Sequence, residues 1–129
     1  MKPLVVVAGI VWQEGRFLIA RRPMHKANGG LWEFPGGKIE QGETPQEALA
    51  RELREEMDFE VRVGPIVDAG MCHDENGGVL ILFYWCRPLA GPPKALEHSE
   101  LRWVLPGEIL ACVFPPADRA MAERIAHGL

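Results

Sequence analysis

A single helix is the most strongly specified element of this chain of 129 residues, and the rest must fold around it. Thr44 can cap free backbone N–H groups, Pro45 suits the first helical position, and Glu47 can reach back to close a capping box. A spacing of about 100° per residue puts a set of apolar side chains on one side, namely Leu49, Ala50, Leu53 and Met57. The pattern predicts a helix over residues 45–57 with one face packed into a core.

A separate face of this helix is acidic. Glu52, Glu55 and Glu56 cluster within an arc of roughly 100°. Carboxylates held together repel, so they are stable mainly when a cation lies among them or when water screens them. Oxygen-rich acidic sites favour magnesium or manganese over zinc. The alternative is a solvated, salt-bridged face, because Arg51 is four residues from both Glu47 and Glu55.

The charged positions continue upstream into a glycine-rich turn. Residues 37–56 fit the pattern G-x5-E-x7-R-E-L-x-E-E, which begins with Gly37 and Glu43. This pattern closely resembles the signature of the Nudix hydrolases. The resemblance implies an α/β (α+β) fold, with a mixed β-sheet sandwiched between α-helices, in a single Nudix domain over residues 1–129. It also implies that Glu43 and Arg51 pair and hold the loop onto the helix, orienting the site from the second shell around the metal.

The resemblance implies a set of metal ligands, which are the backbone carbonyl of Gly36 and the carboxylates of Glu52, Glu55, Glu56 and Glu97. The catalytic glutamates it implies are Glu52, Glu56 and Glu97, and either Glu52 or Glu97 could be the general base. Glu97 precedes Trp103 by six residues, the spacing of the late catalytic glutamate in the MutT-type pattern. A surface role for Glu97, or the use of His98 or Glu100 in its place, stays open.

Three longer stretches resemble the MutT-type branch of the family, and they cover nearly the whole chain. They are LWEFPGGKIEQGETP, the paired Arg21 and Arg22, and FPPAD near the C-terminus. Members of this branch use Mg²⁺, with Mn²⁺ as an alternative, to hydrolyse nucleoside triphosphates to a monophosphate and pyrophosphate. Some clean oxidised guanine nucleotides such as 8-oxo-dGTP from the pool, a DNA-repair function, and related enzymes act on CTP or 5-methyl-dCTP. For this chain the resemblance implies the 8-oxo-dGTP type of activity, with the CTP or 5-methyl-dCTP type as the alternative.

Substrate contacts are expected from Arg22, Glu33, Phe34, Gly36 and Asp118. Arg22 could grip a phosphate with its planar fork, or it could be an exposed charge after a strand. Asp118 stands where the guanine-sanitising pattern has Asn, and an ionised Asp only accepts hydrogen bonds. This departure favours the CTP-type relatives, although Asp118 could instead cap the last helix. The aromatic side chains that could stack on a base, or belong to the core, are Trp32, Phe34, Phe83 and Trp85.

One position departs from the signature at the end of the helix. The family usually has glycine two residues after the last glutamate, in the left-handed conformation of a C-cap, and this chain has Asp58. Asp enters that region more readily than most residues, at a cost of about 1 kcal/mol. The substitution therefore concerns the turn rather than the activity.

Composition agrees with a small enzyme rather than a polymer-binding protein. A net charge of −4 argues against a non-specific nucleic-acid binder, which would show a basic face. The odd number of cysteines, without metal-type spacing, suits a reduced, cytoplasmic protein. The apolar run of residues 4–12 is too short to span a membrane. The oligomeric state, monomer or dimer, stays open, and a non-catalytic nucleotide-binding module is the alternative from another class.

The remaining elements follow from apolar runs and turn residues. Strands are expected near 4–12, 16–21, 31–34, 60–68, 78–87 and 100–104, with a short helical turn at 106–110 and a terminal helix at 117–127. Strands mixed with two helices predict a layered αβ domain.

Overall fold

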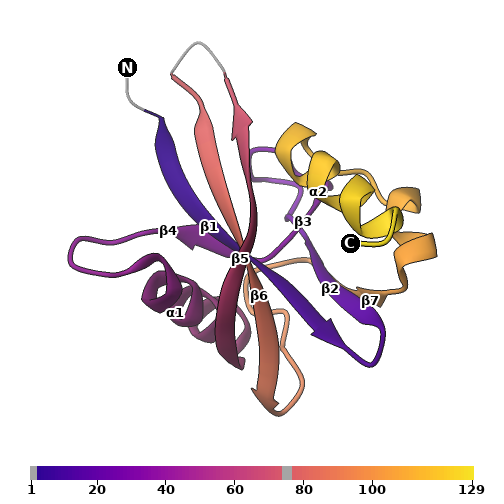
Figure 1. The fold of residues 1–129 in the computed structure, drawn as a ribbon, viewed down its shortest axis with the longest axis horizontal. Helices are drawn as coiled ribbons and strands as arrows, with labels where there is room; N and C mark the ends of the chain where they lie inside the picture. The colour runs from indigo at the N-terminus through magenta and orange to yellow at the C-terminus, as the bar shows by residue number, and fades with distance from the viewer. Residues whose placement is uncertain (1–2, 74–76) are drawn as a thin grey trace.

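The computed structural model describes residues 3–73 and 77–129, and its elements follow the predicted order (Figure 1). The strands are β1 Leu4–Gln13, β2 Arg16–Arg21, β3 Trp32–Glu33, β4 Gly36–Lys38, β5 Glu60–Cys72, β6 Val79–Ala90 and β7 Glu100–Val104. The helices are α1 Pro45–Met57, the short 3₁₀ helix η1 Pro106–Ala111, and α2 Pro116–Ala126. The first helix has the predicted bounds, whereas β5 and β6 run further than expected, and β4 lies where only a glycine-rich turn was expected.

The sheet is mixed, as the resemblance implies. β1 pairs in parallel with β6 from Leu4 against Val79 to Val11 against Cys86, and the other pairings are antiparallel. The main path runs β3-β2-β1-β6-β5, with β4 paired to β1 and β7 paired to β2. The central strand β1 therefore carries β4, and with it the glycine-rich segment, at one end.

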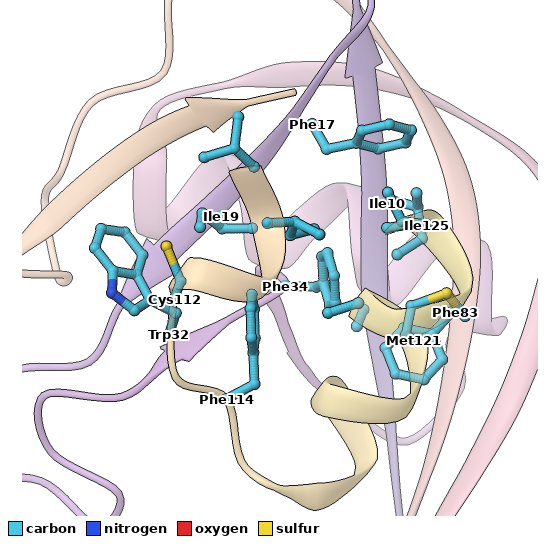
Figure 2. Close-up of a cluster of buried hydrophobic side chains, with 14 residues drawn as sticks. Ile10, Phe17, Ile19, Trp32, Phe34, Phe83, Cys112, Phe114, Met121 and Ile125 are labelled. Carbon is cyan, nitrogen blue, oxygen red and sulfur yellow. The ribbon is translucent and has the colours of Figure 1, made fainter. Parts of the chain in front are cut away.

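Both faces of the sheet are covered, which explains why β1 is apolar almost throughout. Val7 and Val11 belong to a core with α1, whereas Ala8 and Ile10, on the opposite face, belong to a core with α2 and η1. In Figure 1 the two α-helices lie on opposite sides of the sheet. Figure 2 shows the second core, where the ring of Phe34 stacks on that of Phe114 with centroids 5.5 Å apart. The fold is thus a mixed α+β sandwich.

The start and end of α1 show why its bounds could be predicted. The backbone N–H of Glu47 donates to Thr44 Oγ1 (3.1 Å), and the Thr44 N–H donates to Glu47 Oε1 (2.8 Å), completing the capping box. Glu47 is thus engaged at the cap, and no ion pair joins it to Arg51 among the described residues. At the other end Asp58 adopts the left-handed conformation, with φ 49°, and its carboxylate pairs with Lys94 Nζ at 3.0 Å.

Within residues 3–73 and 77–129, no helix combines the length and apolar character needed to cross a bilayer.

Candidate active site

The acidic face of α1 and the end of β4 border a cavity of about 200 Å³. The residues that line it come from separate parts of the chain: Arg22, Pro23, Lys26, Glu33, Gly36, Glu52, Glu56, Glu97 and His98. α1 supplies Glu52 and Glu56, one helical turn apart, while Glu97 arrives from the loop between β6 and β7. Sequence positions 36, 52, 56 and 97, predicted together as metal ligands, thus meet in one space.

Glu56 lies in surroundings that disfavour the ionised form of its carboxyl group. Its residue is only 8% exposed, and its Oε2 is buried without a hydrogen-bond partner. Burial raises the pKa of Glu56 to about 9, and the charges of Glu52, Glu33 and Glu97 act in the same direction. A buried acceptor without a partner is costly, and a cation is the partner that would satisfy it.

Ion pairs of Arg51 with Glu43 and Glu52 form a clamp that holds Glu52 in the cavity beside Glu56. Arg51 Nε donates to Glu43 Oε2 (2.6 Å), and its Nη2 donates to Glu43 Oε1 (3.0 Å), a bidentate pair. Arg51 also donates from Nη1 to Glu52 Oε1 (3.0 Å) and from Nη2 to the backbone oxygen of Lys38 (3.0 Å). Burial raises the pKa of Glu52, whereas the hydrogen bond from Arg51 opposes that rise. The clamp therefore ties the loop after β4 to α1 and fixes Glu52 in direction.

A second network, formed by Arg22, Glu33 and His98, also borders the cavity. Arg22 Nη1 donates to Glu33 Oε1 (3.1 Å), and His98 Nε2 lies 3.0 Å from Glu33 Oε2. The Ser99 N–H donates to the backbone oxygen of Arg21 (3.0 Å), so the loop that carries Glu97 is fastened to β2 and β3. Arg22 is thereby placed with its cationic head toward the cavity that holds the carboxylates.

Two further cavities adjoin the first and lead to Asp118. One of about 290 Å³ and one of about 170 Å³ share Arg22, Glu33 and Asp118 among their lining residues. Asp118 is 8% exposed, and its Oδ1 accepts a hydrogen bond from the Phe34 N–H at 3.3 Å. Burial raises the pKa of Asp118 to about 7. The alternative of a helix cap is wrong, because the N-cap of α2 is Pro115 and no side chain caps it.

The combination of converging glutamates, a braced arginine and an adjoining pocket can be compared with known proteins. The model of the NUDIX domain matches residues 2–126. The chain belongs to the Nudix family. Its relatives include a CTP pyrophosphohydrolase of Escherichia coli strain K12, 41% identical over 124 residues, or 95% of this chain and 91% of the relative.

Other relatives carry a second substrate name. An 8-oxo-dGTP diphosphatase of Haemophilus influenzae is 31% identical over 127 residues, covering 98% of this chain and 93% of the relative. The crystal structure of a MutT protein from Methanosarcina mazei Go1 superimposes with a TM-score of 0.85 at 29% identity, covering 98% of this chain and 95% of that one. The chain is therefore a Nudix hydrolase with a MutT-like fold.

Not every residue predicted for the site of this Nudix hydrolase lies in these cavities. Glu55 lines none of the three; its side chain is 57% exposed and pairs with Arg51 Nη1 at 3.2 Å. Phe34 does line the cavity of about 170 Å³, but its ring packs between Phe83 and Phe114, and its backbone N–H donates to Asp118. The functional roles of all these residues stay predictions.

The structure adds Lys26 to the cavity and includes His98, which the sequence offered only as a substitute for Glu97. Lys26 lines it, and its positive charge opposes the rise in the pKa of Glu56. His98 lines it as well and contacts Glu33. Lys26 could have been proposed from the sequence, because it is a cationic residue in the loop soon after Arg22. No local pattern shows that His98 is a partner of Glu33 rather than a substitute for Glu97.

The residues present fit a divalent cation. The donor set is made of oxygens, and the orphaned Oε2 of Glu56 lacks a partner that a cation would supply. In the described part of the chain, no group of three or more His, Cys, Asp or Glu side chains is placed so that it could hold a metal ion without moving. The carboxylates would therefore have to adjust around the ion, with the Gly36 carbonyl as an additional ligand.

Replacing Gly37 with Ala is expected to lower kcat about 10- to 100-fold while the protein stays folded. A Cβ atom at Gly37 would overlap the carboxylate carbon of Glu52, the end of a side chain that can swing away. Steady-state hydrolysis and thermal melting measure the two effects. Gly107→Ala is the matched control, because a Cβ there meets nothing within 4 Å. A Gly37→Ala enzyme with the wild-type rate would show that the position of Glu52 is unimportant.

Proposed function

We propose that this Nudix hydrolase uses Mg²⁺, or Mn²⁺, to hydrolyse a nucleoside triphosphate to the monophosphate and pyrophosphate. The observation that carries the proposal is that Glu52, Glu56 and Glu97 line one cavity together with Arg22 and Lys26. Acidic and basic groups around one small space suit a ligand that is itself a metal-bound polyphosphate.

The chain's own residues divide the work. Glu56 and Glu52, with Glu97 and the Gly36 carbonyl, would hold the cation, which when bound neutralises phosphate charge and favours ionisation of water. Arg22 and Lys26 would hold the phosphate oxygens, since a guanidinium and an ammonium both donate to them. Water adds to phosphorus as the α–β phosphoanhydride bond breaks and pyrophosphate departs.

One glutamate takes the proton that the attacking water loses. Glu52 and Glu97 both line the cavity, and the bond from Arg51 engages one oxygen, Oε1, of Glu52. Either carboxylate could therefore act as the base in this proposal. The clamp of Arg51 and Glu43 would act indirectly, by keeping Glu52 pointed at the reacting phosphate.

The base of the substrate would lie in the adjoining cavities, against Asp118. Cytosine is the first candidate, supported by the E. coli relative named CTP pyrophosphohydrolase and by an acidic residue facing the pocket. Oxidised guanine, as in 8-oxo-dGTP, is the second candidate, supported by the relatives named 8-oxo-dGTP diphosphatase. In that case the enzyme would clean the nucleotide pool and so protect DNA. A cytoplasmic location agrees with the free state of all three cysteines.

A panel of triphosphates tests the proposal. The purified chain is incubated with Mg²⁺, inorganic pyrophosphatase and CTP, dCTP, 5-methyl-dCTP, dGTP or 8-oxo-dGTP, and released phosphate is measured with malachite green. We expect release from at least one substrate, abolished by EDTA, and the monophosphate as the nucleotide product by chromatography. No release from any of the five would refute the proposed reaction, and a diphosphate product would refute the bond assignment.

A further inference from the structure

A fourth cavity lies away from the carboxylates, toward the far end of β1, and shares no lining residue with the three active-site cavities. Its volume is about 410 Å³, within the range of small-molecule sites. Its lining comes from β1, β5 and β6: Trp12, Arg62, Gly64, Pro65, Trp85, Cys86 and Arg87. Two indoles and two guanidinium groups therefore border one hollow, and no carboxylate is among these lining residues.

Strand register puts these four side chains on one face of the sheet. Arg62 and Arg87 are direct partners in the antiparallel pair of β5 and β6. Trp85 precedes Arg87 by two residues and lies beside Ile10, and Trp12 follows Ile10 by two residues. Because alternate residues of a strand share a face, the four side chains point the same way.

The two arginines are unusual in this protein. Every other arginine in the described chain forms an ion pair with a carboxylate, whereas Arg62 and Arg87 form none with any described residue. Like charges directly opposite each other on neighbouring strands destabilise a sheet. Both side chains are exposed, so solvent weakens this repulsion, and a bound anion would remove what is left of it.

Trp12 and Trp85 indicate which class of anion would fit this cavity. Trp12 is 47% exposed although it is one of the largest apolar side chains. Trp85 is half-buried, and the ring of Phe17 lies 6.4 Å from its own, centroid to centroid, which holds the indole in place. Exposed aromatic faces stack on nucleobases, and paired guanidinium groups bind phosphate.

We propose that this hollow is a second nucleotide site, in which Arg62 and Arg87 bind the phosphate of a nucleoside monophosphate and Trp12 and Trp85 contact its base. The site does not depend on the hydrolytic function proposed above, since the two share no residue. Neither arginine belongs to the catalytic machinery, so their replacement leaves hydrolysis unchanged.

Binding of GMP to the metal-free full chain tests the proposal. In EDTA, the indole N–H resonances of Trp12 and Trp85, assigned by single Trp→Phe variants, should shift saturably. The double variant Arg62→Gln/Arg87→Gln should raise the Kd for GMP at least tenfold, and Trp12→Leu should do the same. Inorganic phosphate, which lacks a base, should bind at least tenfold more weakly than GMP.

The matched control is Arg119→Gln/Arg124→Gln. It removes the same charge from two arginines of α2 that are each ion-paired with a carboxylate, and it should leave the Kd for GMP within twofold of the wild-type value. Hydrolysis of the best triphosphate should stay within twofold in Arg62→Gln/Arg87→Gln. The proposal is overturned if the indole resonances do not shift or do not saturate, or if the two double variants have equal Kd values for GMP. It is also overturned if Arg62→Gln/Arg87→Gln loses hydrolysis, or if analytical ultracentrifugation shows a dimer that buries Trp12. Binding of a ten-residue thymidine oligonucleotide without binding of GMP would also overturn it, in favour of a single-strand surface.

Discussion

Replacing Glu56 with Gln is expected to lower kcat at least 100-fold and, at the same time, to make the metal-free protein more stable at pH 8. The loss of rate follows from removing a buried carboxyl group that would be ionised when it holds the cation. The gain in stability follows from the raised pKa, which stands at about 9 in the folded chain against an ordinary 4.5. Steady-state hydrolysis and thermal melting in EDTA measure the two effects.

The direction of the stability effect follows from proton linkage. Between pH 4.5 and 9 the unfolded chain releases the Glu56 proton while the folded chain retains it. Wild-type stability therefore declines through this window as pH rises, and each unit of pKa difference corresponds to about 1.4 kcal/mol. Gln has no proton to lose, so the variant lacks this decline, and its Tm at pH 8 should be higher by at least about 3 °C.

Glu55→Gln is the comparison variant, because it removes the same charge from the same helix at a side chain that is 57% exposed. We expect it to lower kcat less than tenfold and to leave the Tm rise on adding Mg²⁺ intact. The Glu56→Gln protein should lose most of that Mg²⁺-dependent rise. A near-wild-type rate in Glu56→Gln would refute the assignment of Glu56 as a ligand, and a 100-fold loss in Glu55→Gln would restore Glu55 to the site.

The helix that bears these residues could be predicted because its determinants are local. Thr44, Pro45 and Glu47 specify the start through contacts within four residues, and the apolar spacing specifies the buried face. The left-handed end at Asp58 could also be anticipated from the signature. Its ion pair with Lys94 joins residues 36 positions apart, which no local pattern specifies.

The short strand β4 could not be predicted, because glycine has two uses that a sequence does not separate. Gly36 and Gly37 read as a turn, yet neither has a positive φ angle. A Cβ at Gly36 would overlap the backbone oxygen of Val7, so the glycine permits close pairing of β4 with β1. The strand expected near 60–68 already ran past Gly64, where a register shift between Val63 and Ile66 accommodates a glycine and a proline, but β5 continues further, to Cys72.

The carboxylates of α1 were easier to predict than the rest of the site. Glu52 and Glu56 follow from helical spacing, but Glu97 depends on where a loop is fastened. Hydrogen bonds from the Lys94 N–H to Met57 and from the Ser99 N–H to Arg21 fix that loop, and both join distant positions. Only the resemblance to a family could point to Glu97, and Glu33 acquires a partner in His98 through tertiary contact alone.

If Asp118 contacts the base as proposed, its ionisation decides which base it favours. Burial raises the pKa of Asp118 to about 7, so the carboxyl is neutral below that pH and ionised above it. A neutral carboxyl both donates and accepts, which matches the adjacent N3 acceptor and amine donor of cytosine. An ionised carboxylate only accepts, which matches the two neighbouring N–H donors of guanine. The same residue would thus favour different bases on either side of pH 7.

Asp118→Ala is accordingly expected to lower kcat/KM about 100-fold for the preferred substrate, because it removes the group that would pair with the base. If cytosine is preferred, the wild-type kcat/KM for CTP should fall as pH rises above about 7, and Asp118→Asn, which stays neutral, should lack that fall. A rise of wild-type kcat/KM for 8-oxo-dGTP over the same interval would identify guanine instead. The comparison of wild type with Asp118→Asn separates the titration of this carboxyl from that of the active-site glutamates. Unchanged kcat/KM in Asp118→Ala for every nucleotide would remove Asp118 from base recognition.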